Sequence, residues 1–274
     1  PSGVWDVLAH PNGRVYFTTF FDAAGILEPD GSVTVLEKAG PGLNELALGP
    51  AGRILASRYA TDRDGRGAVV VMGEDGRVQA EFSLASPEGF QAAAKSLAWD
   101  PVRGEIWVNT DLIPDDPGTP NAHDTRVLSA GGRERVRFER PEVHFMTFGE
   151  DGTGYFAEVA DGHLRLRVRP PEAARTPIGT GRWILLDDAF PADVDFVQEI
   201  QVDAKGNAIV TRWSGMIHVV SASGRARNLQ LPRREGDLYY TGVLTEGRVC
   251  ATVCRASRDP VGDAAWVVCG PDPG

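Results

Sequence analysis

Hydrophobic and polar residues alternate with period two along much of the chain, in short runs that end at glycine-containing turns. Runs such as RVYF and RILA place every second side chain on the same face, which is typical of β-strands. Amphipathic helices would instead repeat apolar residues every three to four positions. The pattern therefore predicts an all-β protein built from hairpins.

One turn pattern recurs six times: a Pro or an acidic residue shortly before a Gly, followed by an aromatic or aliphatic strand. It reads HPNGRVYF, GPAGRILA, DPVRGEIW, GEDGTGYF, DAKGNAIV and, less regularly, TEGRVCA. The turn glycines are Gly13, Gly52, Gly104, Gly152, Gly206 and Gly247, at intervals of 39, 52, 48, 54 and 41 residues. These intervals match the length of one propeller blade. A second hairpin turn follows in most repeats, so each repeat supplies four strands.

The repeats predict an all-β fold, a six-bladed β-propeller of four-stranded antiparallel blades. We expect one domain, residues 1–274, with blades at about 1–39, 40–90, 91–141, 142–192, 193–234 and 235–274. The sixth repeat offers only three strands, so the last blade is expected to be one strand short or to close with three. A β-sandwich is the alternative, but sandwiches rarely repeat one turn motif at such spacing.

Charge and composition narrow the classes of partner. The net charge of -10 and the pI near 5.0 would repel phosphate backbones, so we expect no nucleic-acid partner. No apolar run approaches the roughly 20 residues needed to span a bilayer, so we expect no membrane span. The first residues contain neither an initiator Met nor a signal-peptide core, which suggests a processed end. We expect a monomer that binds a small molecule. The location is left open, with a secreted or periplasmic one favoured over a cytoplasmic one.

The three cysteines all lie near the end of the chain and lack the spacing of a metal site: Cys250, Cys254 and Cys269. Two of them can form one disulfide, and buried thiols are the alternative. The segments RVCATVC and AWVVC flank one turn, so Cys250 and Cys269 are predicted to lie on neighbouring strands.

Candidate site residues come from equivalent positions in the repeats, because the first strand of each propeller blade lines the channel. Eight residues before each turn glycine, with an adjustment in the third repeat, lie Trp5, Asn44, Lys95, His144, Gln198 and Tyr239. The following positions include Glu45 and Glu199, and the matching second-strand positions include Arg58, Glu158 and Arg212. His163 and His218 fall on third strands and are predicted to be structural.

Two strands carry a family resemblance. LNELALGPAGR, with Asn44, and VQEIQVDAKGNAIV resemble strands of the six-bladed senescence-marker-protein, gluconolactonase and related calcium-dependent lactonase propellers. This chain has Gln198 where that family has a metal-binding Asp, and Trp5 where it has a metal-binding Glu. The resemblance implies a lactonase with a divalent cation, Ca²⁺ or Mg²⁺, and the candidate metal ligands are Asn44, Glu45 and Gln198.

A second resemblance is to virginiamycin B lyase, a seven-bladed propeller whose repeats read like RVYFTTFFDAAGILEPDGSVTVL. In that family a His on the first strand and a Glu on the second strand of one blade act near Mg²⁺. His144 and Glu158, in VHFMTFGEDGTGYFAEV, have matching placement and spacing.

The leading functional hypothesis is a hydrolase of a lactone or related ester at the mouth of the propeller channel. Glu158, His144 and Glu199 are the candidate catalytic residues, and Arg58, Lys95 and Arg212 are the candidate substrate-binding residues. The alternatives are a metal-assisted lyase of the virginiamycin B lyase type and a non-catalytic propeller that binds a ligand or a protein. The sequence contains no Gly-x-Ser-x-Gly elbow, the motif that would indicate a covalent serine nucleophile.

Two acidic loops stand out in the sequence. TDRDGRG, with Asp62 and Asp64, holds a fragment of a calcium-loop pattern without its bidentate Glu, and it is expected to be a polar turn. Residues 111–124, DLIPDDPGTPNAHD, read as a long loop that carries several carboxylates, and such loops often bind ligands. A calcium site in the second loop is a weaker alternative to a channel site.

Overall fold

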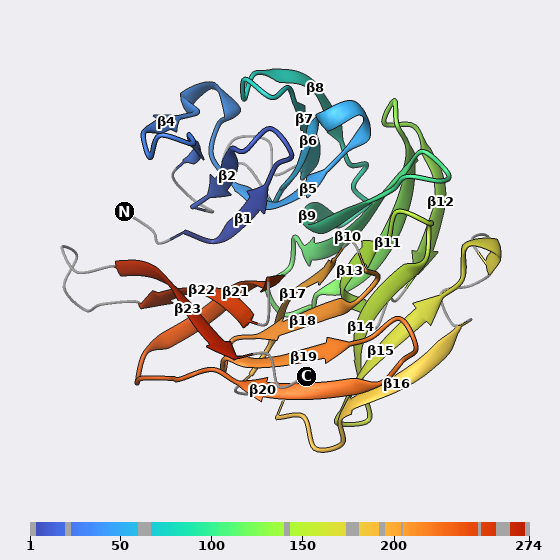
Figure 1. The fold of residues 1–274 in the computed structure, drawn as a ribbon. Helices are drawn as coiled ribbons and strands as arrows, with labels where there is room; N and C mark the ends of the chain where they lie inside the picture. The colour runs from blue at the N-terminus through green and yellow to red at the C-terminus, as the bar shows by residue number, and fades with distance from the viewer. Residues whose placement is uncertain are drawn as a thin grey trace. The chain divides into compact units, whose positions relative to one another are not determined.

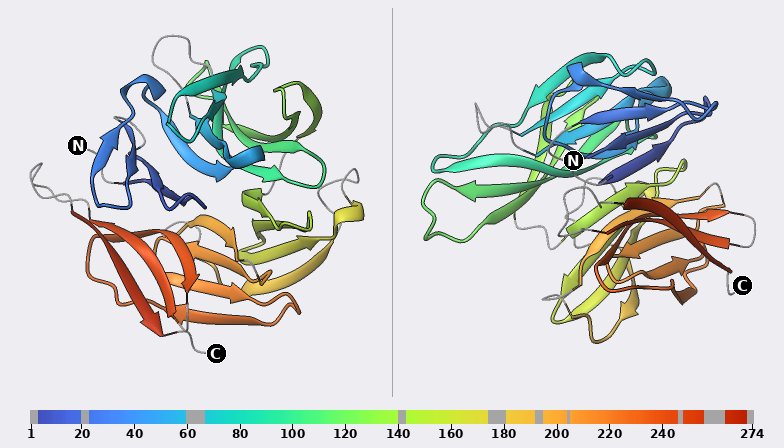
Figure 2. Two further views of the ribbon diagram at one scale, coloured as in Figure 1. Left: turned by 45° about the horizontal axis from the view of Figure 1, so that its top comes forward. Right: turned by 90° about the vertical axis from the view of Figure 1, so that its left-hand side faces the viewer.

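The computed structural model is an all-β, six-bladed β-propeller (Figure 1; further views in Figure 2). It describes residues 4–19, 23–59, 67–139, 143–173, 181–191, 195–203, 205–245, 248–255 and 264–271. Over these ranges, five blades have four antiparallel strands and the last has three. Helical structure in the described residues is limited to single 3-10 turns at Glu37–Ala39, Pro50–Gly52 and Pro171–Ala173. None of these has the length or apolar character of a membrane span.

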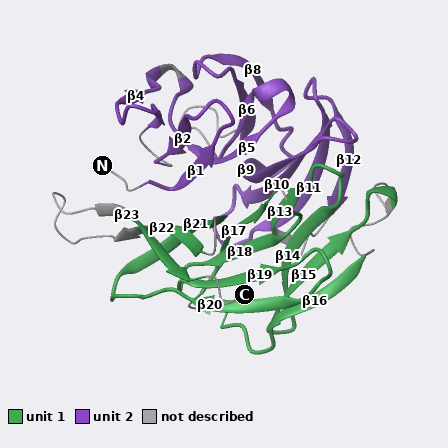
Figure 3. Ribbon diagram, in the orientation of Figure 1, with its two compact units in different colours: residues 1, 142–274 green, residues 2–141 purple. Residues whose placement is uncertain are grey.

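The first three blades form one compact unit, drawn in purple in Figure 3. Blade 1 contains β1 (Asp6–Ala9), β2 (Val15–Thr18), β3 (Ala24–Leu27) and β4 (Val33–Val35). Blade 2 contains β5 (Leu43–Leu48), β6 (Ile54–Arg58), β7 (Ala68–Met72) and β8 (Val78–Ser83). Blade 3 contains β9 (Phe90–Asp100), β10 (Glu105–Pro114), β11 (Ala122–Ser129) and β12 (Glu134–Glu139).

The last three blades form the other compact unit, drawn in green in Figure 3. Blade 4 contains β13 (Val143–Phe148), β14 (Gly154–Ala160), β15 (His163–Arg169) and β16 (Arg182–Asp187). Blade 5 contains β17 (Val197–Val202), β18 (Ala208–Arg212), β19 (Met216–Val220) and β20 (Ala226–Gln230). Blade 6 contains β21 (Asp237–Thr245), β22 (Arg248–Arg255) and β23 (Ala264–Pro271). That the chain is a single domain stays a prediction.

The recurring turn joins the first and second strands of a blade, as the sequence predicts. Its glycine has a positive φ, between 63° and 86°, at Gly13, Gly52, Gly104, Gly152 and Gly206. Residues with a Cβ rarely adopt this conformation, which explains why the pattern repeats with glycine at this place. Gly247 lies outside the described residues.

The hydrophobic core lies between neighbouring blades within each unit. One cluster joins blades 2 and 3 and includes Val69, Ala94 and Val108, all fully buried. A second cluster joins blades 4 and 5 and includes Leu166 and Ile200. Because a blade in the middle of such a stack is covered on both faces, its inner strands read as continuous apolar runs such as AVVVM in β7.

The first strand of each of blades 2 to 6 contains a β-bulge. The extra residues include Asn44 and Glu45 in β5, Lys95 in β9, His144 in β13, Gln198 in β17, and Tyr240 and Thr241 in β21. Bulges redirect side chains and occur often beside active sites. Most of the row selected from the sequence therefore lies at an irregularity that recurs from blade to blade.

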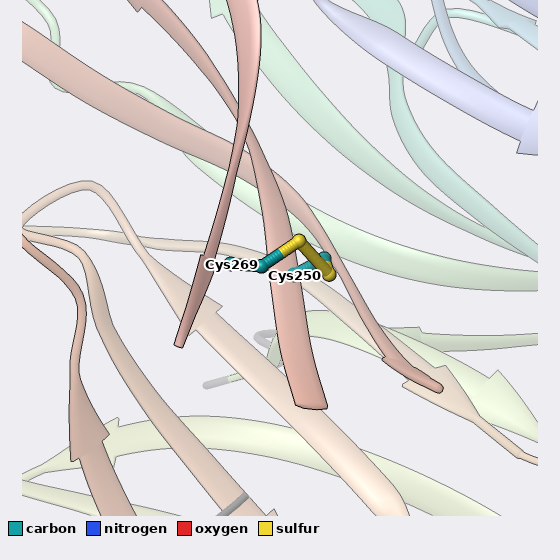
Figure 4. Close-up of a disulfide and its surroundings, with 2 residues drawn as sticks. All are labelled: Cys250 and Cys269. Carbon is teal, nitrogen blue, oxygen red and sulfur yellow. A yellow bond between two sulfur atoms is a disulfide. The ribbon is translucent and has the colours of Figure 1, made fainter. Parts of the chain in front are cut away.

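A disulfide links the middle strand of blade 6, β22, to the last strand, β23 (Figure 4). Cys250 in β22 lies directly opposite Cys269 in β23, with their Cα atoms 4.0 Å apart. The prediction that these two residues lie on neighbouring strands is confirmed. The side chain of Cys254 lies outside the described part of the chain.

Candidate functional site

Blade 3 extends beyond its bulge and carries polar side chains there. β9 begins at Phe90, well before the bulge at Lys95, and β10 continues alongside it to Pro114. On the extended part, Asp111 of β10 lies opposite His123 of β11 in the strand register. Residues directly opposite each other on antiparallel strands have side chains on the same face, so the register brings these two groups together.

Asp111 and His123 form a hydrogen-bonded pair. The Nδ1 atom of His123 lies 2.8 Å from Oδ1 of Asp111. Asp111 is buried, with 7% of its surface exposed. Burial acts to raise the pKa of Asp111, but the hydrogen bond from His123 and the charge of Lys95 outweigh it and hold the pKa below its ordinary value. The carboxylate is thus ionised at neutral pH, and Nδ1–H of His123 donates a hydrogen bond to it.

Tyr59, the residue after β6, brings blade 2 into this site. Its hydroxyl donates to Oδ2 of Asp111 at 3.1 Å, so both carboxylate oxygens accept a hydrogen bond. Burial raises the pKa of the half-buried Tyr59, and the charge of Asp111 adds to the effect. The phenol therefore stays protonated and helps to fix the orientation of the carboxylate.

Lys95 is the cation of the site. Its Nζ lies 4.0 Å from Oδ1 of Asp111, beyond hydrogen-bond distance, and its side chain is 35% exposed. No hydrogen bond from this ammonium group to another described residue is found, so its donors remain available to a ligand.

The backbone of Lys95 is fixed by blade 2. The carbonyl oxygen of Lys95 accepts hydrogen bonds from Asn44 Nδ2 at 2.5 Å and from Ser57 Oγ at 3.2 Å. An equivalent contact holds the bulge of blade 2, where Thr18 Oγ1 donates to the carbonyl oxygen of Asn44 at 2.7 Å. These contacts set the position from which the Lys95 side chain leaves the strand.

This arrangement can activate water. With Nδ1 of His123 directed to an ionised carboxylate, the neutral imidazole has its lone pair on Nε2. The His123 side chain is 48% exposed, so solvent reaches the imidazole ring. A buried carboxylate behind the imidazole also stabilises the imidazolium that forms when Nε2 takes a proton. Asp111 and His123 together therefore have the chemistry of a general base.

Arg58 has its guanidinium engaged in structural contacts. It donates to the carbonyl oxygens of Pro41 at 2.7 Å and Ala39 at 2.8 Å, and lies 3.3 Å from Glu81. The residue is 5% exposed. These contacts hold the connection between blades 1 and 2 on the end of β6. The predicted role of Arg58 in substrate binding stays a prediction.

Glu158, in the other unit, is part of a buried ion pair. Its two oxygens lie 2.9 Å and 3.0 Å from Nε and Nη2 of Arg167, and the residue is 1% exposed. Arg167 in turn lies over the ring of Trp183, 3.8 Å from its centroid. A carboxylate held at both oxygens and shielded from solvent is poorly placed to take a proton from a substrate. Its predicted partner His144 lies in β13, and the side chain of His144 falls outside the described part of the structure.

Arg212 also has its guanidinium engaged in structural contacts. It donates to Asp195 at 2.8 Å and to Asp187 at 2.6 Å, and it lies over the ring of Phe190. Gln198 accepts a hydrogen bond from the indole of Trp213, and Glu199 accepts one from Gln201 at 2.6 Å. The predicted convergence of Asn44, His144, Glu158 and Gln198 on one end of the channel stays a prediction.

The predicted metal ligands fit a divalent cation only in part. Oδ1 of Asn44 is buried without a hydrogen-bond partner among the described residues, which suits a cation ligand. The side-chain oxygen of Gln198, by contrast, already accepts the Trp213 indole. In the ranges that the structure describes, no cluster of three or more His, Cys, Asp or Glu is arranged to hold a metal. The three predicted ligands and the divalent cation stay predictions.

The predicted acidic loop at residues 111–124 is mostly a hairpin, which corrects the sequence interpretation. The strands continue to Pro114 and resume at Ala122, so only 115–121 connect them. Asp111 faces His123, whereas Asp124, one position along β11, points to the opposite face and pairs with Arg126. The carboxylates do not gather as calcium ligands. Asp62 and Asp64 of the other predicted loop lie outside the described residues.

Sequence reasoning missed His123 and Tyr59. A signal for His123 is present, because Asp111 and His123 are equally distant from Pro117 in DLIPDDPGTPNAH, as partners across a hairpin turn would be. Tyr59 gives no such signal, since its partner is 52 residues away on another blade.

Comparisons with known proteins find similarity to solved structures alone. Neither a protein-family model nor a curated protein sequence matches the chain. The solved structures it resembles include a gluconolactonase of Xanthomonas campestris, with a TM-score of 0.65, 15% identity, and 98% of this chain and 86% of that chain covered. These likenesses show a shared fold.

Two further solved structures match both resemblances seen in the sequence. Regucalcin of Agrobacterium tumefaciens, a calcium-binding protein, has a TM-score of 0.61 and 17% identity, with 94% of this chain and 83% of that chain covered. Virginiamycin B lyase of Staphylococcus aureus has a TM-score of 0.59 and 15% identity, with 99% and 85% covered. At such identities neither likeness carries an activity over to this chain.

Proposed function

We propose that this protein is a hydrolase of a lactone or related ester, and that His123 is its general base. The single observation that carries the proposal is the hydrogen bond between His123 and the buried, ionised Asp111 on the extended part of blade 3. The gluconolactonase structures among its structural neighbours support the choice of substrate class. A base that activates water is the group that hydrolysis of a lactone requires.

The proposed reaction uses only water and the substrate. Nε2 of His123 takes a proton from water while the water oxygen bonds to the lactone carbonyl carbon, and the carbonyl electron pair moves to its oxygen. The carbonyl then re-forms and the bond to the ring oxygen breaks, and this oxygen takes the proton from His123. Asp111 stabilises the imidazolium between the two steps and keeps the ring oriented. The product is a hydroxy acid.

The test is hydrolysis of a panel of lactones, followed as acid release at constant pH, by wild type and His123→Gln. We expect wild type to hydrolyse at least one lactone, and the variant to lose about 10²- to 10⁴-fold in kcat, because the substitution removes a base. His163→Gln, a third-strand histidine of blade 4, is the matched control and should retain wild-type rates. Full activity in a correctly folded His123→Gln protein would refute the assignment of the base.

A further inference from the structure

The charged groups around Asp111 bear on the kind of lactone that the site accepts, a question that rests on the proposed hydrolase function. Of the three candidate substrate-binding cations, Arg58 and Arg212 each donate at least two hydrogen bonds to protein acceptors. Among the residues that the structure describes, the ammonium of Lys95 has only the 4.0 Å contact with Asp111. Lys95 is therefore the cation of this set that retains hydrogen-bonding capacity for a ligand.

The position of Lys95 is built into the fold. Its carbonyl oxygen is held by Asn44 and Ser57 of blade 2, at 2.5 Å and 3.2 Å. The bulge that includes Lys95 sits between Ser96 and Ala94 in the register with β10. Because the main chain makes these contacts, the side chain is free to serve a ligand, and substitution of Lys95 keeps the anchoring hydrogen bonds.

Lys95 approaches the catalytic pair from its Asp111 side. Nζ of Lys95 and Nδ1 of His123 both lie near the same carboxylate oxygen, Oδ1 of Asp111. The proposed base is Nε2, the ring nitrogen that is not directed to this oxygen. A group bound by Lys95 is thus suited to be a substituent of the substrate, apart from the carbonyl that water attacks.

The charge balance favours a singly charged group. One ammonium lies beside one ionised carboxylate, so the pair is neutral. In the described part of the chain no Arg and no second Lys pairs with Asp111, so nothing there offsets its repulsion of a doubly charged phosphate. Phosphate sites generally combine several donors, such as an Arg fork or backbone N–H groups. A carboxylate needs only the one charge-assisted hydrogen bond that Lys95 can give.

We infer that the Asp111–His123 site is selective for lactones that carry a carboxylate, and that Lys95 is the residue that binds this carboxylate. Selectivity then resides in the Michaelis constant, because the salt bridge forms when the substrate binds and persists through the reaction.

The experiment compares γ-butyrolactone with γ-carboxy-γ-butyrolactone, using wild type, Lys95→Met and, as control, Lys205→Met. Lys205 is an exposed lysine of the turn between β17 and β18, in the other unit. We expect wild type and Lys205→Met to prefer the carboxylated lactone through a lower KM. In Lys95→Met this preference, as a ratio of KM values, should fall about 10- to 100-fold, the effect of one charge-assisted hydrogen bond.

Calorimetric binding keeps the test independent of turnover. γ-Carboxy-γ-butyrolactone should bind His123→Gln protein about 10- to 100-fold more tightly than it binds the Lys95→Met/His123→Gln double variant. Equal binding, or a Lys95→Met effect on kcat alone, would overturn the inference about Lys95 and leave the hydrolase proposal standing. Absence of hydrolysis of every lactone by wild type would instead overturn the proposed function.

Discussion

Lys95 uses its main chain and its side chain for separate purposes. The carbonyl oxygen joins blade 3 to Asn44 and Ser57 of blade 2, and the ammonium lies near Asp111. A β-bulge makes this division possible, because the extra residue is left out of the ladder hydrogen bonding. The same residue can therefore stabilise the contact between two blades and present a charge to solvent.

The sequence predicts charged residues at equivalent strand positions, but it does not reveal their partners. Arg58, Glu158 and Arg212 occupy such positions, and the sequence makes all three candidates together with Lys95. What separates Lys95 from them is the set of acceptors nearby, such as the Ala39 and Pro41 carbonyls that hold Arg58. These acceptors lie on loops and neighbouring strands, and spacing along the chain carries little information about them.

His218 provides a prediction about stability and pH. The residue is 1% exposed, and its Nδ1 donates to Oδ1 of Asn228 at 2.8 Å. Its pKa is lowered to about 4, chiefly by burial. The ordinary value is 6.5, so between pH 6.5 and pH 4 the unfolded chain binds a proton here that the folded chain does not. The free energy of unfolding should therefore fall as the pH is lowered through this window.

The measurement is urea unfolding of wild type and His218→Gln at a series of pH values. The variant loses this titration, so the stability difference between the two proteins should change by about 3 kcal/mol in favour of the variant as the pH falls from 6.5 to 4. His163→Gln, which makes the same substitution at a histidine of blade 4, is the control. A difference that is constant over this range would contradict the burial of a neutral His218.

At the scale of elements, the length of the blade 3 hairpin creates the site. β5, β13 and β17 begin one residue before their bulges, whereas β9 begins at Phe90 and carries its partners β10 and β11 with it. The sequence indicated strands, turns and their order correctly. It did not indicate that DLIP would continue a strand, because Asp, Pro and Gly nearby are typical of loops.

Blade 6 offers a prediction about the disulfide. The Cys250–Cys269 bond closes a segment with a sequence separation of 19 residues and ties β23 to β22. Its loss should lower the free energy of unfolding by about 3 kcal/mol, mainly because the unfolded chain gains freedom. We expect Cys250→Ser/Cys269→Ser to melt at a lower temperature than oxidised wild type.

A reductant provides the matched comparison for this variant. Dithiothreitol should lower the melting temperature of wild type toward that of the double variant and leave the double variant unchanged. Identical melting temperatures for oxidised wild type and the double variant would show that the bond contributes nothing to the stability of the blade.

At the scale of the whole molecule, the repeat pattern determined the architecture. Six turn motifs predict six blades, and the structure has six. The last repeat offers only three strands, and in the described residues the last blade has three strands. The repeats could not indicate which blades differ from the rest. That information lies in departures from the repeat, such as the longer third blade, and the proposed activity depends on one of them.

The most direct test of the central claim is chemical rescue of His123→Ala by imidazole during lactone hydrolysis. The His123 side chain is 48% exposed, so a free imidazole can enter the space left by the substitution and pair with Asp111. We predict that His123→Ala loses about 10²-fold or more in kcat and that added imidazole restores activity in proportion to its concentration. Wild-type activity in the absence of imidazole, or a folded variant that imidazole does not rescue, would contradict the role of His123 as the base.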